Sequence, residues 1–267
     1  MTVKIPAGSR AYAVASPPVE AEGVTFSDAD LDHTLAQRLP PILSDSAGTR
    51  QIEDLLGGVA NTAFAADNLR AALKPTHTVY DWQVGEAMAE AYLTDHRQCE
   101  FPWPSGRDLR NPEASPAGAD LVGFQSHKGS VRFAFGEVKT STEAKWPPQV
   151  VTGRHGLAKQ LEELRDSKQV KNHLAIVYLA HRASRADWGS RYRQAAARYL
   201  ARDSDVSLFG VLVRDVEPKR EDLASRTDLL ATNCPSDTSI ELRALYLPSG
   251  SIPSLAARVQ AHTGGVR

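Results

Sequence analysis

Two short apolar runs, 121–124 and 131–135, constrain the fold of this chain most strongly, because they predict neighbouring strands of a β-hairpin. Asp120 comes directly before the first run, and Glu137 and Lys139 follow the second. Residues two apart in a strand point to the same face, so Glu137 and Lys139 are expected to project together, beside Asp120 across the hairpin. Two carboxylates and one ammonium in so small a space predict a divalent-metal site of the kind that supports phosphodiester hydrolysis.

The rest of the chain predicts an α/β fold. Expected helices span 51–73 (interrupted at Gly57-Gly58), 81–96, 153–168, 187–202 and 252–262, and further expected strands span 173–180, 207–214 and 239–247, with room for a short strand near 100–103. Residues 1–47 are rich in Pro, Ala and Ser and are expected to form an N-terminal extension, with structure only around 31–39. Residues 48–267 are expected to form one domain, with its core at about 81–180.

Composition limits the cellular setting. An apolar content of 42% is enough to bury a large core. Cys99 and Cys234 are too few and too far apart for a zinc-ligand set or a disulfide framework, which indicates a reducing compartment. The longest apolar run, 174–180, is far too short to cross a membrane, and residues 1–6 do not resemble a signal peptide. We therefore expect a cytoplasmic protein without a membrane partner.

Charge is strongly segregated although the net charge is only -1. Residues 126–202 contain fifteen Lys and Arg against six Asp and Glu, and the rest of the chain has the opposite excess. A localised positive surface suits a polyanion such as DNA, because each neutralised phosphate releases condensed counterions. The alternative is that these residues merely coat solvated helices.

The pattern Gly118-x-Asp120 followed by Glu137-x-Lys139 resembles the active-site motif of the PD-(D/E)xK nuclease superfamily, which has the restriction-endonuclease-like fold. Ala119 stands where the family motif has a proline. The expected order of elements over 81–180 is similar to the family core, a central mixed sheet flanked by helices, here with extra C-terminal strands. The resemblance implies a hydrolase, namely a nuclease or endonuclease that cuts DNA with Mg2+ or Mn2+.

The resemblance also implies roles for individual residues. Asp120 and Glu137 would bind the metal ion, with the Val138 carbonyl as a third ligand. Lys139 would orient the attacking water or stabilise the transition state, which makes physical sense because an ammonium offsets developing negative charge.

The family often recruits another acid from the first core helix. Glu86 is the candidate for this catalytic and metal-binding role, because Trp82 and Ala89, one turn away, and Leu93, two turns away, are apolar. Glu90, one turn further along the helix, is its competitor.

Several residues after the motif strand are candidates for contacts with nucleic acid. They are Lys145, Arg154, His155, Lys159 and Gln160. Some branches of the family carry a glutamine at the position of Gln160, but those branches follow it with a tyrosine, whereas Glu163 and Leu164 stand here.

A narrower resemblance involves two later apolar segments, 209–215 and 240–248. Together with the Glu137-x-Lys139 strand, they resemble the nuclease subunits of Hachiman-type anti-phage defence, which pair with a helicase. This resemblance implies antiviral defence and a helicase partner chain. Cutting both strands of a duplex also favours two active sites, so a homo-oligomer or a hetero-complex is expected.

Two other interpretations remain open. In the first, the chain is a non-catalytic subunit that keeps the nuclease fold and binds nucleic acid or supports assembly. Alternatively, the three charged residues meet by chance in an unrelated α/β protein, which predicts neither metal dependence nor affinity for DNA.

Overall fold

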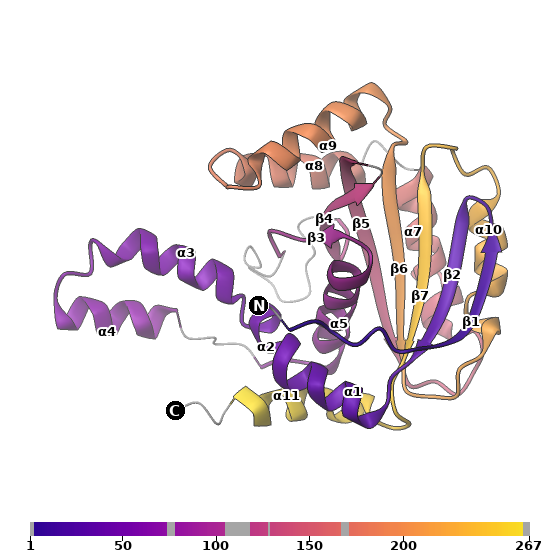
Figure 1. Ribbon diagram of the computed structural model, residues 1–267, viewed down its shortest axis with the longest axis horizontal. Coiled ribbons are helices and arrows are strands. Elements are labelled where there is room, and N and C mark those ends of the chain that lie inside the picture. The colour runs from indigo at the N-terminus through magenta and orange to yellow at the C-terminus, as the bar shows by residue number, and fades with distance from the viewer. Residues whose placement is uncertain (1–2, 74–77, 105–117, 128, 167–170, 264–267) are drawn as a thin grey trace.

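The chain forms an α/β fold in which a seven-stranded mixed sheet is flanked by helices (Figure 1). The computed structural model describes residues 3–73, 78–104, 118–127, 129–166 and 171–263. The strands are β1 Ser9–Ser16, β2 Val19–Thr25, β3 Cys99–Glu100, β4 Leu121–His127, β5 Ser130–Ser141, β6 Val206–Arg214 and β7 Ser239–Tyr246. Their order across the sheet is β1-β2-β7-β6-β5-β4-β3.

The predicted hairpin is confirmed, because β4 and β5 pair antiparallel with Leu121 opposite Gly136. The predicted strands 207–214 and 239–247 are also confirmed, as β6 and β7. The β5–β6, β6–β7 and β7–β2 pairs are parallel, whereas the edge strands β1 and β3 pair antiparallel with β2 and β4. The strand that carries the predicted metal ligands therefore lies inside the sheet, between β4 and β6.

Helices precede, connect and follow the strands. The α-helices are α1 Asp28–His33, α2 Pro40–Leu43, α3 Ser46–Gly57, α4 Ala63–Ala72, α5 Asp81–His96, α6 Gln149–Thr152, α7 Leu157–Asp166, α8 Lys171–Ala183, α9 Gly189–Ala201, α10 Ala224–Ala231 and α11 Leu255–Thr263. Short segments of other helix types are η1 Thr34–Arg38, η3 Arg220–Asp222 and η4 Ile252–Ser254. The predicted helix 81–96 matches α5, and the predicted helix 51–73 is two helices that separate at the glycine pair.

The two faces of the sheet bury separate apolar cores. α5 packs on one face, where Ala134 and Val138 of β5 are buried. α7 and α9 pack on the other face, where Phe133 and Phe135 are buried. Because side chains alternate along a strand, Glu137 projects on the same side as the two phenylalanines.

The predicted strand at 173–180 is wrong, because these residues belong to helix α8. Ala175, Tyr178 and Leu179 are buried at helical spacing, while Val177 between them is 56% exposed. Burial on one side only is the pattern of an amphipathic helix. A short apolar run does not by itself distinguish a buried strand from a helix.

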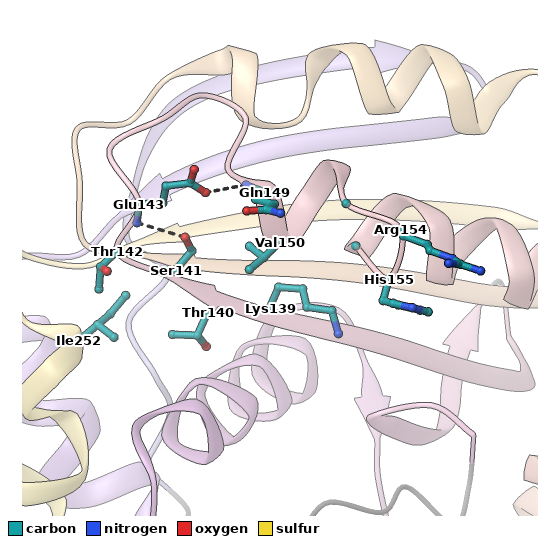
Figure 2. Close-up of a pocket in the computed structure, with 12 residues that line it drawn as sticks. Lys139, Thr140, Ser141, Thr142, Glu143, Gln149, Val150, Arg154, His155 and Ile252 are labelled. Atoms are coloured by element: carbon teal, nitrogen blue, oxygen red, sulfur yellow. Dashed lines mark hydrogen bonds between the residues drawn. The ribbon is translucent and has the colours of Figure 1, made fainter.

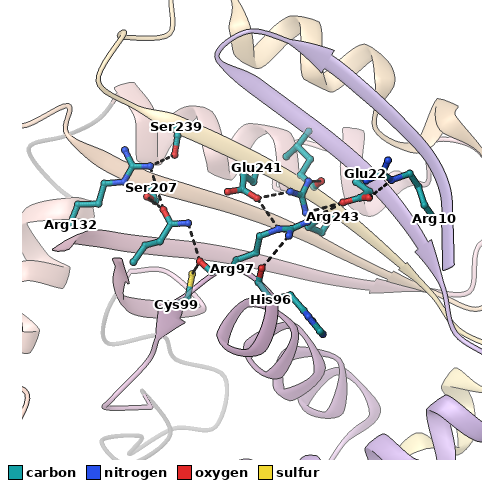
Figure 3. A network of polar contacts seen from close by, with 12 residues as sticks. Arg10, Glu22, His96, Arg97, Cys99, Arg132, Ser207, Ser239, Glu241 and Arg243 are labelled. Carbon is teal, nitrogen blue, oxygen red and sulfur yellow. Dashed lines mark hydrogen bonds and ion pairs between the residues drawn. The ribbon is translucent and has the colours of Figure 1, made fainter. Parts of the chain in front are cut away.

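The expectation that structure before residue 47 is confined to 31–39 is also wrong. β2 pairs in parallel with β7 along its whole length, and β1 pairs with β2. Val19 and Ala21 of β2 are buried in the core. Figure 3 shows a network of ion pairs in which Glu22 of β2 meets Arg97 at the end of α5, while Arg97 also contacts Glu241 of β7. The N-terminal strands are thus tied to the body of the protein.

Helices α3 and α4 form a hairpin that projects away from the sheet (Figure 1). Leu55, Val59 and Phe64 in this segment are each more than 70% exposed. Among the described residues, no helix is both long and apolar enough to cross a membrane.

Candidate metal centre and active site

The candidate site lies where β5 extends beyond the start of β4. β4 begins at Leu121, opposite Gly136, whereas β5 continues to Ser141. Asp120, one residue before β4, accepts a hydrogen bond from the Val138 N–H at 2.8 Å through its Oδ2. Asp120 lies just before β4, and its side chain accepts a hydrogen bond from the backbone of β5. This hydrogen bond fixes the Asp120 side chain against the edge of β5.

Lys139 faces two carboxylates. Its Nζ lies 3.7 Å from Glu137 Oε2 and 3.9 Å from Asp120 Oδ2. Both separations exceed normal hydrogen-bond length, so these are charge contacts rather than close hydrogen bonds. The side chain of Glu137 is only 2% exposed, while those of Asp120 and Lys139 are about one-fifth exposed. The three groups therefore form a partly open cluster with one carboxylate at its buried end.

Glu86 belongs to the same electrostatic cluster, although it comes from α5. Burial raises the pKa of Glu86 to about 8, with a further increase from Asp120. Lys139 acts in the opposite direction, and Glu137 and Glu90 add smaller increases. The carboxyl group of Glu86 is therefore mostly protonated at neutral pH, because burial penalises its charged form and the neighbouring carboxylates add to this effect.

The donors present fit a hard divalent cation. Within the described residues, no group of three or more His, Cys, Asp and Glu side chains is arranged to hold a metal ion. Mg2+, however, is usually bound by one or two protein carboxylates, with waters completing its shell. Asp120 and Glu137 supply two carboxylates, and the Asp120 charge contributes to the raised pKa of Glu86.

A pocket of about 710 Å3 opens beside Lys139. Figure 2 shows Arg154 and His155 on the same side of this pocket as the Lys139 ammonium. The full lining comprises Lys139, Thr140, Ser141, Thr142, Glu143, Gln149, Val150, Gly153, Arg154, His155, Gly156 and Ile252. Lys139 of the cluster and two of the predicted nucleic-acid contacts therefore line one cavity, whereas Asp120, Glu137 and Glu86 are not among its lining residues.

The other three predicted contacts are not among the residues that line this pocket. Lys159 and Gln160 lie on α7, where Lys159 forms an ion pair with Glu162 at 3.3 Å. Gln160 Oε1 is buried and accepts no hydrogen bond from the described residues. Lys145 is exposed in the loop after β5, and its backbone carbonyl accepts a hydrogen bond from Arg214.

The structure adds residues that sequence reasoning missed. Thr140, Ser141 and Thr142 line the pocket directly after Lys139, and Gln149 follows from α6. Arg214, at the end of β6, holds the loop that forms part of the pocket wall. Two features of the sequence could have indicated these residues. One is the run of hydroxyl residues after the motif, and the other is the charged residue that ends an otherwise apolar strand.

Comparison with known proteins gives no family for the chain: no protein-family model matches it, and no curated protein is significantly similar to it.

Proposed function

We propose that this chain is a metal-dependent nuclease that hydrolyses DNA phosphodiester bonds, built on a restriction-endonuclease-like core. The observation that carries the proposal is the convergence of Asp120, Glu137 and Lys139 within 4 Å contacts at the open edge of β5. Two carboxylates suit Mg2+ or Mn2+, and the lysine adds a fixed positive charge.

A bound divalent cation would polarise the phosphodiester and lower the pKa of a water molecule. Asp120, fixed by the Val138 N–H, and the buried Glu137 would hold that ion, with Glu86 as an additional acid. The Lys139 ammonium is placed to stabilise negative charge that develops on the phosphate. The burial of Glu137, whose side chain is 2% exposed, would favour a preorganised site.

The order of elements supports the proposed fold class. α5, the strands β3 to β5, and α7 follow one another as in the core that the motif resembles. The next strand is β6, which is parallel to β5 and takes the place expected for 173–180. Two additional helices, α8 and α9, separate it from α7.

The charge distribution supports a polyanionic substrate. Arg154 and His155 line the pocket beside Lys139 and are exposed to solvent. Arg185 and Arg193, also in the basic segment 126–202, are exposed near and on α9. The resemblance to Hachiman-type nuclease subunits extends the proposal to anti-phage defence beside a helicase partner, which would control the activity of this chain.

A second candidate function is a non-catalytic subunit that binds nucleic acid. The observation that favours it is the absence, among the described residues, of a three-acid metal cluster. This alternative predicts affinity for DNA without metal-dependent cleavage.

Cleavage of supercoiled and linear plasmid tests the proposal, with Mg2+, Mn2+ or EDTA, for the wild type and Asp120→Asn. The asparagine keeps an oxygen that accepts the Val138 N–H bond but removes the charge. We expect metal-dependent cutting that falls about a hundredfold or more in the variant, since a metal ligand is lost.

Asp67→Asn is the matched control, because Asp67 is 64% exposed on α4 and pairs with Arg70 in a surface contact. Cutting by this control should equal that of the wild type. Equal cutting by Asp120→Asn would refute the site. Wild-type protein that binds DNA but never cuts, alone or with a helicase, would favour the non-catalytic alternative.

A further inference from the structure

Arg214 lies on the same sheet face as the candidate active site. In the parallel pairing of β5 with β6, Lys139 is opposite Leu212 and Ser141 is opposite Arg214. Arg214 therefore lies on the strand next to β5, two residues further along the strand direction than Lys139. Its side chain is 0% exposed, although it ends in a guanidinium group.

Two sets of contacts surround this guanidinium. On one side, Arg214 pairs with the fully buried Asp222, whose Oδ2 also accepts a hydrogen bond from the Tyr246 hydroxyl at 2.6 Å. On the other side, Arg214 donates to the backbone carbonyls of Glu143 and Lys145. The guanidinium thus connects a fixed buried anion to the segment that follows β5.

That segment, residues 142–148, is here called the β5–α6 loop. Thr142 and Glu143 of the loop line the pocket that contains Lys139. The carboxylate of Glu143 also accepts a hydrogen bond from the Gln149 N–H at 2.6 Å, which joins the loop to α6 (Figure 2). The position of this pocket wall therefore depends on the carbonyl groups that Arg214 holds.

Stability alone gives a weak reason for such a residue. A buried ion pair is often no more stabilising than apolar side chains of the same volume, because both charges lose their hydration. Arg214 Nε is moreover buried without a hydrogen-bond partner among the described residues. A guanidinium, unlike an apolar side chain, provides a fixed set of hydrogen-bond donors directed at the loop.

We propose that Arg214 is a positioning residue: it holds the β5–α6 loop in the conformation that forms the pocket beside Lys139, and so sets where a substrate strand lies relative to Asp120 and Glu137. This inference rests on the proposed nuclease function. Displacement of a substrate by about 1 Å is enough to lower a rate about a hundredfold.

The test compares Arg214→Met with Arg165→Met. Arg165 is a matched control because it is also buried, also pairs with an aspartate, and also donates to two backbone carbonyls, those of Leu230 and Thr232. It does not line the pocket. Amide hydrogen exchange of the β5–α6 loop and the kcat and KM for cleavage of a linear duplex in Mn2+ are measured for both variants.

We expect faster exchange in residues 142–148 and a 10- to 100-fold lower kcat/KM only for Arg214→Met. Unchanged exchange in the loop, cleavage within twofold of the wild type, or an equal loss in Arg165→Met would each overturn the proposal.

Arg214→Lys serves if the methionine variant does not fold, because it keeps a positive charge beside Asp222 but loses the fixed fork of donors. It should give the same changes in smaller degree, and wild-type behaviour in both readouts would overturn the proposal. If the wild type cuts neither alone nor with a helicase, the proposed function fails, and hydrogen exchange alone then decides whether Arg214 holds the loop.

Discussion

At the scale of single residues, the ammonium of Lys139 faces two carboxylates at once. Its Nζ lies 3.7 Å from Glu137 Oε2 and 3.9 Å from Asp120 Oδ2, so it forms a close hydrogen bond with neither of these oxygens. An arrangement with closer contacts would be a simple structural ion pair. The proposed metal-dependent site would require the more open arrangement, because the ion and the lysine would have to coexist there.

Glu86 gives a prediction about pH. Its folded-state pKa of about 8 exceeds the ordinary value of 4.5, so between these pH values the folded protein keeps a proton that the unfolded chain has lost. The metal-free protein should therefore lose stability as pH rises from about 4.5 to about 8. Glu86→Gln should remove this loss, and its advantage over the wild type should grow with pH. Urea unfolding in EDTA at pH 5, 6.5 and 8 measures it.

Glu53→Gln is the control for this experiment, because Glu53 is exposed on α3. It should follow the wild type at each pH. A stability difference between Glu86→Gln and the wild type that stays constant from pH 5 to pH 8 would contradict the assignment of a raised pKa to Glu86.

The residues predicted best from sequence are those whose neighbours are local. Glu137 and Lys139 are two apart in one strand, and Asp120 is joined to them by a hairpin, so strand periodicity is enough to place them together. Arg214 reaches the site only through the fold of the β5–α6 loop. No periodicity in the sequence encodes that contact.

At the scale of elements, α7 buries its apolar residues against the sheet, whereas the α3–α4 hairpin exposes apolar residues to solvent. Leu161 of α7 is 0% exposed in the core beneath the sheet, whereas Leu55 of α3 is 76% exposed. Leu161→Ala should lower the free energy of unfolding by about 2 to 5 kcal/mol, because it leaves a cavity. Leu55→Ala should change it by about 0.5 kcal/mol or less. Urea unfolding of each variant measures these differences.

A loss of more than about 2 kcal/mol in Leu55→Ala would contradict the projecting hairpin, because it would show that Leu55 is buried in the protein in solution.

Element type was predictable where the pattern is long and one-sided. The sixteen residues of α5 match the prediction to the residue. The apolar run 174–180 was assigned wrongly because seven residues span about two helical turns, too few for the two periods to be distinguished. The exposed Val177 is visible only in the folded structure.

At the scale of the whole molecule, the sheet joins residues that are far apart in the chain. Val19 pairs with Ile240, and both are 0% exposed. The parallel pairing of β2 with β7 joins residues far apart in the chain and leaves no short-range signal in the sequence, so the attachment of this N-terminal strand to the sheet was not predicted. The location of the charged cluster was predictable, but the full extent of the sheet was not.

Val19→Asp tests this long-range pairing. It places an unpaired carboxylate in the core, so we expect a loss of about 2 kcal/mol or more in the free energy of unfolding. Val3→Asp is the control, since Val3 is 39% exposed and should tolerate the change. Equal denaturation midpoints for the two variants would contradict the placement of β2 inside the sheet.

The most direct test of the central claim is cleavage of a linear DNA duplex in Mn2+ by the wild type and by Lys139→Met. Methionine keeps much of the apolar stem but removes the charge that faces Asp120 and Glu137. The account predicts cutting by the wild type that EDTA abolishes, and a loss of about a hundredfold or more in the variant. Cutting at the wild-type rate by a folded Lys139→Met protein would show that the chemistry occurs elsewhere.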